Sequence, residues 1–247
     1  MSNLTKPNDS PPTLMLNKGK LTSKASPFQQ RVNAAKAEAV DPSTMPNRIC
    51  LMLDRSSSMN TQEQKNRHRI ELLRDAVDNF VARCNFADTS IAIETFPPAV
   101  ELPLTSLPLI ITTSLFNMDA SGNTPMRSCV ERCISKIPMT RGIIVSDGEA
   151  TDWGRSYYDE DESDLKSCVA VLNPYKQAGI PIDCVHIGDS SGEELLRRIA
   201  HETGGVYLKF TDVNAFSNSF GYLTPGYRAM LTDGRVSAKQ LGAKELY

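Results

Sequence analysis

Features typical of membrane-spanning, secreted and nucleic-acid-binding proteins are missing from this sequence. No apolar run reaches the length needed to cross a bilayer, and the N-terminal segment MSNLTKPNDSPPTLMLNKGK has no apolar stretch of the kind found in secretory signals. The formal charge of -2 gives no reason to expect nucleic acid as the main partner. We therefore expect a cytoplasmic protein with no membrane partner and no nucleic-acid partner.

The sequence gives little support for two common classes of functional site. One G-x-S-x-G segment is present, GDSSG at 188–192, but this short motif alone does not identify the nucleophile elbow of a serine hydrolase. Cys129 and Cys133 are one helical turn apart, but no second close cysteine pair or histidine pair completes a zinc pattern. The other cysteines are Cys50, Cys84, Cys168 and Cys184. We interpret all of them as small buried side chains in a reducing compartment.

What is present is ordinary globular composition, with 40% hydrophobic and 23% charged residues in 247. Residues 1–46 are rich in Pro, Ser, Asn and Lys without apolar periodicity, so we predict a flexible basic N-terminal segment. Residues 47–223 are predicted to form one domain. Residues 224–247 form a predicted C-terminal extension, either a hairpin around the TDG at 232–234 or a docking tail.

Strand and helix patterns alternate along the predicted domain. The predicted strands are 47–54, 89–96, 99–107, 141–147, 181–188 and 206–210, of which 99–107 contains proline and suits an edge. The predicted helices are 64–84, 124–137, 164–179, 192–205 and 213–223, with Pro174 disturbing the third. This alternation predicts an α/β fold with a doubly wound, mostly parallel sheet of about six strands and helices on both faces.

Oxygen-bearing side chains follow two of the predicted strands. Asp54 ends the run ICLMLD and is followed by Ser56 and Ser58, Asp147 ends GIIVSD, and Thr124 precedes a helix in DASGNTPM. Because ligands of open α/β sheets gather at the carboxyl ends of the strands, we expect these five side chains to lie together. Polar turns and helix caps are the alternative interpretation.

Two carboxylates and three hydroxyls suit a hard cation, here Mg²⁺ or Mn²⁺. Hydroxyls donate lone pairs without adding negative charge, so the cation would stay a strong Lewis acid. A carboxylate from outside could then complete its coordination. The predicted site is therefore a metal-dependent clasp for an Asp or Glu of a protein partner.

Three segments, DRSSSM, ASGNTPM and VSDGEATD, resemble the loops of a von Willebrand factor A (vWA) domain with a complete metal-ion-dependent adhesion site. The resemblance covers roughly residues 47–223. It implies a Rossmann-like fold with a mostly parallel central sheet and one antiparallel edge strand. It also implies that the divalent ion is held by Asp54, Ser56, Ser58 and Thr124, while Asp147 acts through water.

Within that family, ELPLTSL and DGEATDWG are similar to segments of the intracellular bacterial branch, whose nearest likeness is the vWA proteins of tellurium-resistance clusters. This second resemblance implies a non-catalytic scaffold in a bacterial stress or defence assembly. Kinases, phosphatases and MoxR-type ATPases are the partners that it implies.

Two functions from other classes remain open at this stage. A strand-ending aspartate with Mg²⁺ could serve an Mg-dependent phosphoryl-transfer enzyme, but haloacid-dehalogenase phosphatases carry a second aspartate where this chain has Ser56. Alternatively, the protein is structural and acts through its tails.

Three residues near the predicted loops have two interpretations each. Trp153 either contacts a partner or packs against its own domain, and we favour the second. Asp119 and Asp152 either tune the metal or are ordinary loop acids, and again we favour the second.

Overall fold

The computed structural model describes residues 40–63, 66–148, 150–153, 162–188, 192–210, 216, 220–226 and 244–245. They belong to a compact unit that begins at Val40, ahead of the predicted boundary at residue 47. Residues before β1 contact this unit, because the side chain of Met45 is buried and the Ser90 hydroxyl donates to the carbonyl of Pro42 at 2.7 Å.

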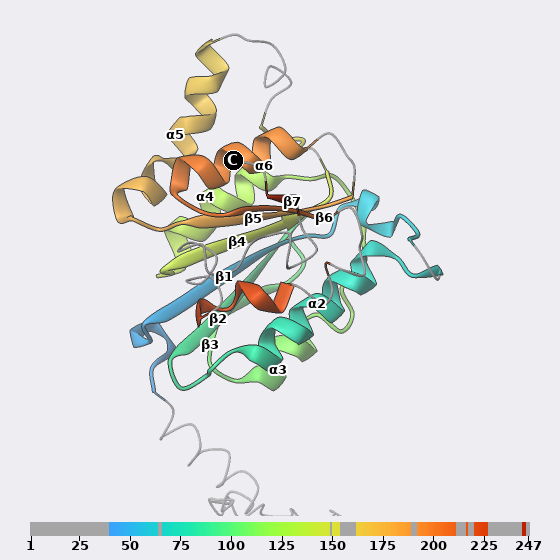
Figure 1. Ribbon diagram of the computed structural model, residues 1–247, viewed down its shortest axis with the longest axis vertical. Coiled ribbons are helices and arrows are strands. Elements are labelled where there is room, and N and C mark those ends of the chain that lie inside the picture. Colours follow the sequence, from blue (N-terminus) through green and yellow to red (C-terminus); the bar gives the residue numbers. More distant parts are fainter. Residues whose placement is uncertain are drawn as a thin grey trace, which may run out of the picture. The chain divides into compact units, whose positions relative to one another are not determined.

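A seven-stranded sheet forms the centre of the unit, in the order β3-β2-β1-β4-β5-β6-β7 (Figure 1). The strands are β1 (Asn47–Asp54), β2 (Thr89–Phe96), β3 (Glu101–Thr105), β4 (Arg141–Ser146), β5 (Ile182–Ile187), β6 (Tyr207–Phe210) and β7 (Lys244–Glu245). The pairs among β1, β2, β4, β5 and β6 are parallel, and β3 and β7 pair antiparallel at the two edges. The predicted doubly wound, mostly parallel fold is confirmed, and β7 adds a short antiparallel strand that was not predicted.

The apolar run of β1 is explained by burial on both faces of the sheet. Ile49, Leu51 and Leu53 belong to one hydrophobic core, whereas Cys50 and Met52 belong to the core on the opposite face. Side chains alternate between faces along a strand, so a central strand needs apolar residues at every position.

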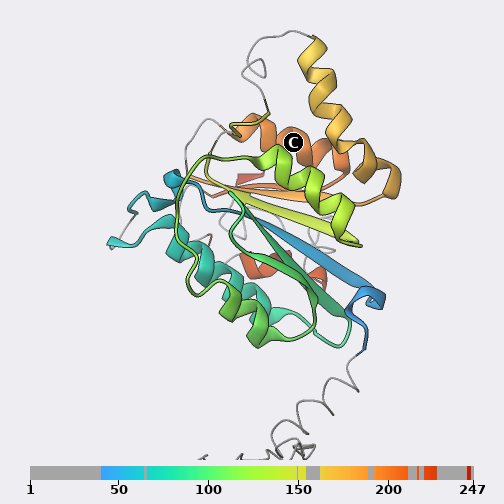
Figure 2. The same cartoon turned by 180° about the vertical axis from the view of Figure 1, so that it is seen from behind.

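Helices cover both faces of the sheet (Figures 1 and 2). The helices are α2 (Arg69–Arg83), α3 (Pro108–Ser114), α4 (Met126–Lys136), α5 (Glu162–Ala178) and α6 (Glu193–Thr203), with 3-10 turns η1 (Pro42–Thr44), η2 (Ser57–Asn60) and η5 (Phe220–Leu223). Side chains of α2, α3 and η5 pack in the first core, and side chains of α4, α5 and α6 pack in the second. None of the helices in the described ranges is long and apolar enough to span a membrane.

Several predicted boundaries differ from the structure. The predicted helix 64–84 begins only at Arg69, because His68 caps it: the His68 backbone N–H donates to the Glu71 carboxylate at 2.8 Å. The sequence analysis missed α3, which has Pro108 in its first turn. Pro174 lies inside α5, as predicted, and it does not end the helix, which continues to Ala178.

The C-terminal predictions are only partly within the described residues. Of the predicted helix 213–223, the structure describes Phe216 and the 3-10 turn Phe220–Leu223. The TDG at 232–234 lies outside the described residues. Lys244–Glu245 pairs with β6, so this part of the predicted extension adds to the sheet.

Candidate metal site

Asp54 ends β1 at the carboxyl edge of the sheet, with its side chain fully buried. One carboxylate oxygen accepts a hydrogen bond from the Ser56 backbone N–H at 2.7 Å, and the other accepts from the Ser146 hydroxyl. The chain then enters η2, where the buried side chain of Met59 anchors the turn in the core. The position of Asp54 is therefore fixed by its strand, by the turn and by the neighbouring strand β4.

Serine hydroxyl groups connect the loop that carries Asp54 to the loop that carries Asp147. The oxygens of Ser56 and Ser58 are 2.9 Å apart, and the Ser58 hydroxyl donates to the Asp147 carboxylate at 2.7 Å. Asp147 follows β4, which is paired with β1, and its side chain is also fully buried. The structure thus brings together Asp54, Ser56, Ser58 and Asp147, as the sequence analysis predicted.

Thr124 lies in a third loop that contacts both of the others. The Ser57 backbone N–H donates to the Gly122 carbonyl at 2.9 Å, and the Thr151 N–H donates to the Thr124 carbonyl at 2.9 Å. Gly122 has φ +80, and a Cβ there would lie 3.0 Å from the Pro97 ring. The side chain of Thr124 is buried at this junction of the three loops.

Burial controls the electrostatics of Asp54. Loss of solvent raises the pKa of its carboxyl to about 6, against the lowering effect of the hydrogen bonds from Ser146 and Ser56. Among the residues that the structure describes, no ion pair reaches Asp54, whereas Asp147 pairs with Arg69. An ionised carboxylate buried in this way is costly unless a cation compensates it.

Arg69 is a site residue that the sequence analysis missed. Its Nη1 donates to the Asp147 carboxylate at 2.7 Å, and its Nε donates to Glu63 at 2.6 Å. Arg69 is the first residue of α2, where a positive charge opposes the helix dipole. That unfavourable placement is the only sequence signal that could have pointed to a function for Arg69.

Comparison with known proteins identifies the fold. No protein-family model matches the sequence, and no curated protein does. Among solved structures, a von Willebrand factor type A protein from Catenulispora acidiphila is 16% identical with TM-score 0.54, over 72% of this chain and 42% of that one. BatB from Bacteroides thetaiotaomicron is 17% identical with TM-score 0.54, over 71% of this chain and 95% of that one. The VWA domain of SpRpn10 is 15% identical with TM-score 0.53, over 68% of this chain and 94% of that one.

This chain has the vWA fold. The resemblance seen in the three loops is therefore matched by the arrangement of the whole sheet and its helices. The chain spans less than half of the Catenulispora protein, 42% of its length. At these identities the likeness shows the fold alone.

The oxygen donors at the carboxyl edge of the sheet suit a hard cation. In the described part of the chain, no three His, Cys, Asp or Glu side chains gather as a metal cluster. A metal at this edge would therefore depend on hydroxyl oxygens as well as on its two carboxylates. Mg²⁺ and Mn²⁺ accept such oxygen donors and keep bound waters in the remaining positions.

The other loop residues have structural roles. Trp153 is buried in the core between the sheet and α4–α6, so the favoured interpretation is confirmed. The Asp152 carboxylate accepts from the backbone N–H groups of Arg127 and Ser128 at 2.9 and 2.8 Å, which caps the start of α4. The Asp119 side chain is 89% exposed.

The cysteines of the described residues also fit the sequence interpretation. Cys50, Cys129, Cys133 and Cys184 are buried and free, and Cys84 is half-buried. Burial raises the pKa of the Cys84 thiol to about 12. The side chain of Cys168 lies outside the described residues. Thiols with raised pKa values are poor nucleophiles and poor metal ligands at neutral pH.

Proposed function

We propose that this vWA-fold protein is a non-catalytic interaction module that binds a carboxylate of a protein partner through a divalent cation. Asp54, Ser56, Ser58, Thr124 and Asp147 would hold Mg²⁺ or Mn²⁺. The observation that carries the proposal is the fully buried Asp54 carboxylate, which lies among hydroxyls with no compensating cation within the described residues. A divalent ion is the simplest compensation for that buried charge.

The residues of this edge would prepare the site for an anionic ligand. A bound divalent cation would supply an open coordination position for an anionic oxygen. Asp54 is held by the Ser56 N–H and the Ser146 hydroxyl, so its carboxylate is oriented before any ligand arrives. The Ser58 hydroxyl donates a hydrogen bond to Asp147 and accepts one from Ser56, which leaves a lone pair available to a cation.

The absence of catalysis is part of the proposal. A phosphoryl-accepting aspartate needs an oxygen that can reach a phosphate, but Asp54 is 0% exposed and both of its oxygens accept hydrogen bonds from the protein. This geometry supports a metal ligand in preference to a nucleophile.

We further propose a cytoplasmic scaffold in a bacterial stress or defence assembly, with kinases, phosphatases or MoxR-type ATPases as partners. This part of the proposal rests only on the resemblance of the segments ELPLTSL and DGEATDWG to the tellurium-resistance proteins.

The metal proposal is tested by thermal unfolding and calorimetry in Mg²⁺ or Mn²⁺ and in EDTA. Wild-type protein should gain about 2.7 kcal/mol of stability when the free cation is at a hundred times its Kd. Asp54→Asn should gain nothing. Asp119→Asn is the matched control, because it removes an aspartate from the same region whose side chain is 89% exposed. A wild-type protein that binds neither ion would refute the proposal.

The interaction proposal is tested by affinity capture from a native lysate with wild-type and Asp54→Asn protein. A partner held by the wild type in millimolar Mg²⁺, released by EDTA and not captured by the variant is the expected result. Partners that remain bound in EDTA and to Asp54→Asn would assign the interaction to the tails of the chain.

A further inference from the structure

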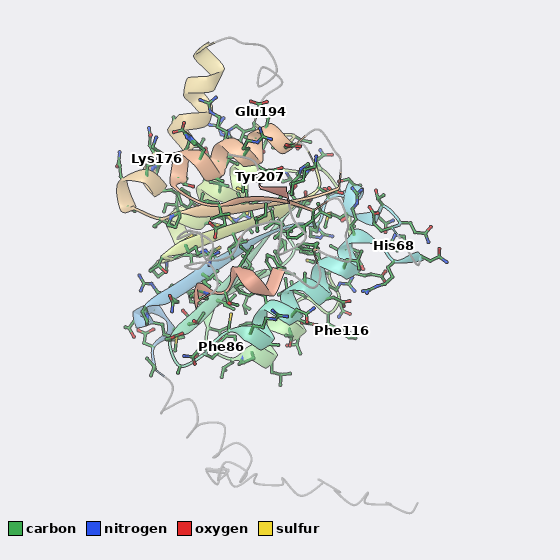
Figure 3. The ribbon with its side chains drawn as sticks, in the orientation of Figure 1. His68, Phe86, Phe116, Lys176, Glu194 and Tyr207 are labelled. Atoms are coloured by element: carbon green, nitrogen blue, oxygen red, sulfur yellow. The ribbon has the colours of Figure 1, made fainter. Side chains whose placement is uncertain are left out.

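Three ion-paired side chains lead from the protein surface to the candidate metal site. Glu63 contacts the Arg69 Nε at 2.6 Å, and the Arg69 Nη1 contacts Asp147 at 2.7 Å. The exposed fraction falls along this row, from 22% at Glu63 through 16% at Arg69 to 0% at Asp147. The row lies beside the N-terminal end of α2, where His68 precedes Arg69 (Figure 3).

The fold leaves a specific space for the Arg69 guanidinium. Gly188, at the end of β5, has φ +86, and a Cβ on it would lie 2.9 Å from the Arg69 Nη2 and 3.2 Å from Cζ. A larger residue at position 188 would require the guanidinium to shift from its present place. The Arg69 N–H also donates to the Thr61 carbonyl at 3.1 Å, which fixes the backbone end of the side chain.

The two oxygens of Asp147 accept hydrogen bonds from different side chains. One oxygen accepts from Ser58, which belongs to the metal loop, and the other accepts from Arg69. The carboxylate is thus oriented from the Ser58 side even without Arg69. The contribution specific to Arg69 is its positive charge. This charge offsets the negative charge of a carboxylate that is proposed to face the cation.

We infer that Glu63 and Arg69 set the charge of the metal site through Asp147, and so tune its affinity for a divalent cation. This inference rests on the proposed function. The positive charge of Arg69 weakens the electrostatic attraction between Asp147 and the cation. The negative charge of Glu63 partly offsets the positive charge of Arg69. The expected benefit is a cation that keeps more of its positive charge for the partner's carboxylate.

Charge tuning and simple support predict different results. The formal charge of the site falls by one in Arg69→Gln and rises by one in Glu63→Gln, and it is unchanged in the double variant. Charge tuning therefore predicts tighter cation binding in the first variant, weaker binding in the second and near wild-type binding in the double variant. A purely supporting role predicts weaker binding in all three, about 10- to 100-fold for loss of such a partner.

The experiment is a calorimetric titration of the full chain with Mn²⁺ alone, at low ionic strength. We expect Kd to fall about threefold or more in Arg69→Gln and to rise by a similar factor in Glu63→Gln. Arg67→Gln is the matched control, because Arg67 lies in the same loop but pairs with the exposed Asp75 at 2.7 Å. Arg69→Lys keeps the charge and should bind Mn²⁺ like the wild type, which keeps the test decisive if Arg69→Gln fails to fold.

The outcomes separate this inference from the proposed function. Wild-type protein that binds no Mn²⁺ would refute both. Wild-type protein that binds Mn²⁺, with Kd shifts of the same sign in Glu63→Gln and Arg69→Gln, would refute charge tuning alone. A change in Glu63→Gln no larger than that in Arg67→Gln would also refute it, since the effect would then not run through Arg69.

Discussion

Replacement of Asp54 by asparagine should stabilise the protein in the absence of divalent metal. The Asp54 carboxyl is fully buried, and its pKa is raised from 3.8 to about 6 because burial disfavours the charged form. An asparagine of the same shape can still accept from the Ser56 N–H and can donate to the Ser146 hydroxyl oxygen. The variant therefore removes a buried charge while its hydrogen-bonding positions remain occupied.

The sign and size of this effect follow from proton linkage. The folded-state pKa of Asp54 is above the unfolded value, so the protonated carboxyl contributes stability that is complete below pH 3.8 and is lost as the pH rises through about 6. At about 1.4 kcal/mol for each pKa unit, the loss amounts to about 3 kcal/mol at neutral pH. Asp54→Asn cannot ionise and should retain this stability.

The assay is urea unfolding followed by circular dichroism, in EDTA, at about pH 7.5 and about pH 4.5. The free energy of unfolding of Asp54→Asn should exceed that of the wild type by about 3 kcal/mol at the higher pH and by about 1 kcal/mol at the lower. Addition of Mg²⁺ should stabilise only the wild type and so reduce or reverse the difference. A difference that does not change with pH, or a variant less stable than the wild type in EDTA at both pH values, would refute the reasoning.

Two further predictions concern the opposite end of the sheet, and both are measured by urea unfolding. Asp183→Asn should lower the free energy of unfolding by about 3–5 kcal/mol, because the buried Arg141 guanidinium loses its ion pair with the Asp183 carboxylate. Gly205→Ala should cost about 3 kcal/mol or more, since its Cβ would lie 1.9 Å from the Ile182 carbonyl oxygen. Gly179→Ala is its control and should cost only about 1 kcal/mol, because φ is +63 but no atom lies within 4 Å. Equal unfolding midpoints for the two glycine variants would contradict the close approach at Gly205.

The central strands could be predicted to within a residue at each end, because strands buried on both faces have long apolar runs. Asn47–Asp54 and Thr89–Phe96 have the predicted bounds, whereas β4 ends one residue early and β5 is one residue shorter at each end than predicted. The edge elements were harder to place. β3 is half-exposed and shorter than its predicted range, and α3 is a seven-residue helix with only one buried side chain, Ile111. Short elements with little burial leave a weak periodic signal.

The candidate site also has parts that could be predicted from the sequence and parts that could not. Asp54, Ser56 and Ser58 follow one strand, so their proximity is a local property of the chain. That Asp147 joins them could be predicted because parallel strands place their carboxyl ends at one edge. The role of Arg69 could not, since the contact with Asp147 joins residues 78 positions apart and depends on the start of α2.

The sequence by itself determined the alternation of strands and helices, the doubly wound sheet and the set of oxygen donors, because these properties depend on periodicity and on the order of elements along the chain. Only the tertiary structure decided which charges meet. It placed Arg69 between Glu63 and Asp147, left Asp54 without an ion pair among the described residues, and added Lys244–Glu245 to the sheet. Side-chain pairing over long sequence separations depends on how helices and loops pack against the sheet, and no local pattern records that packing.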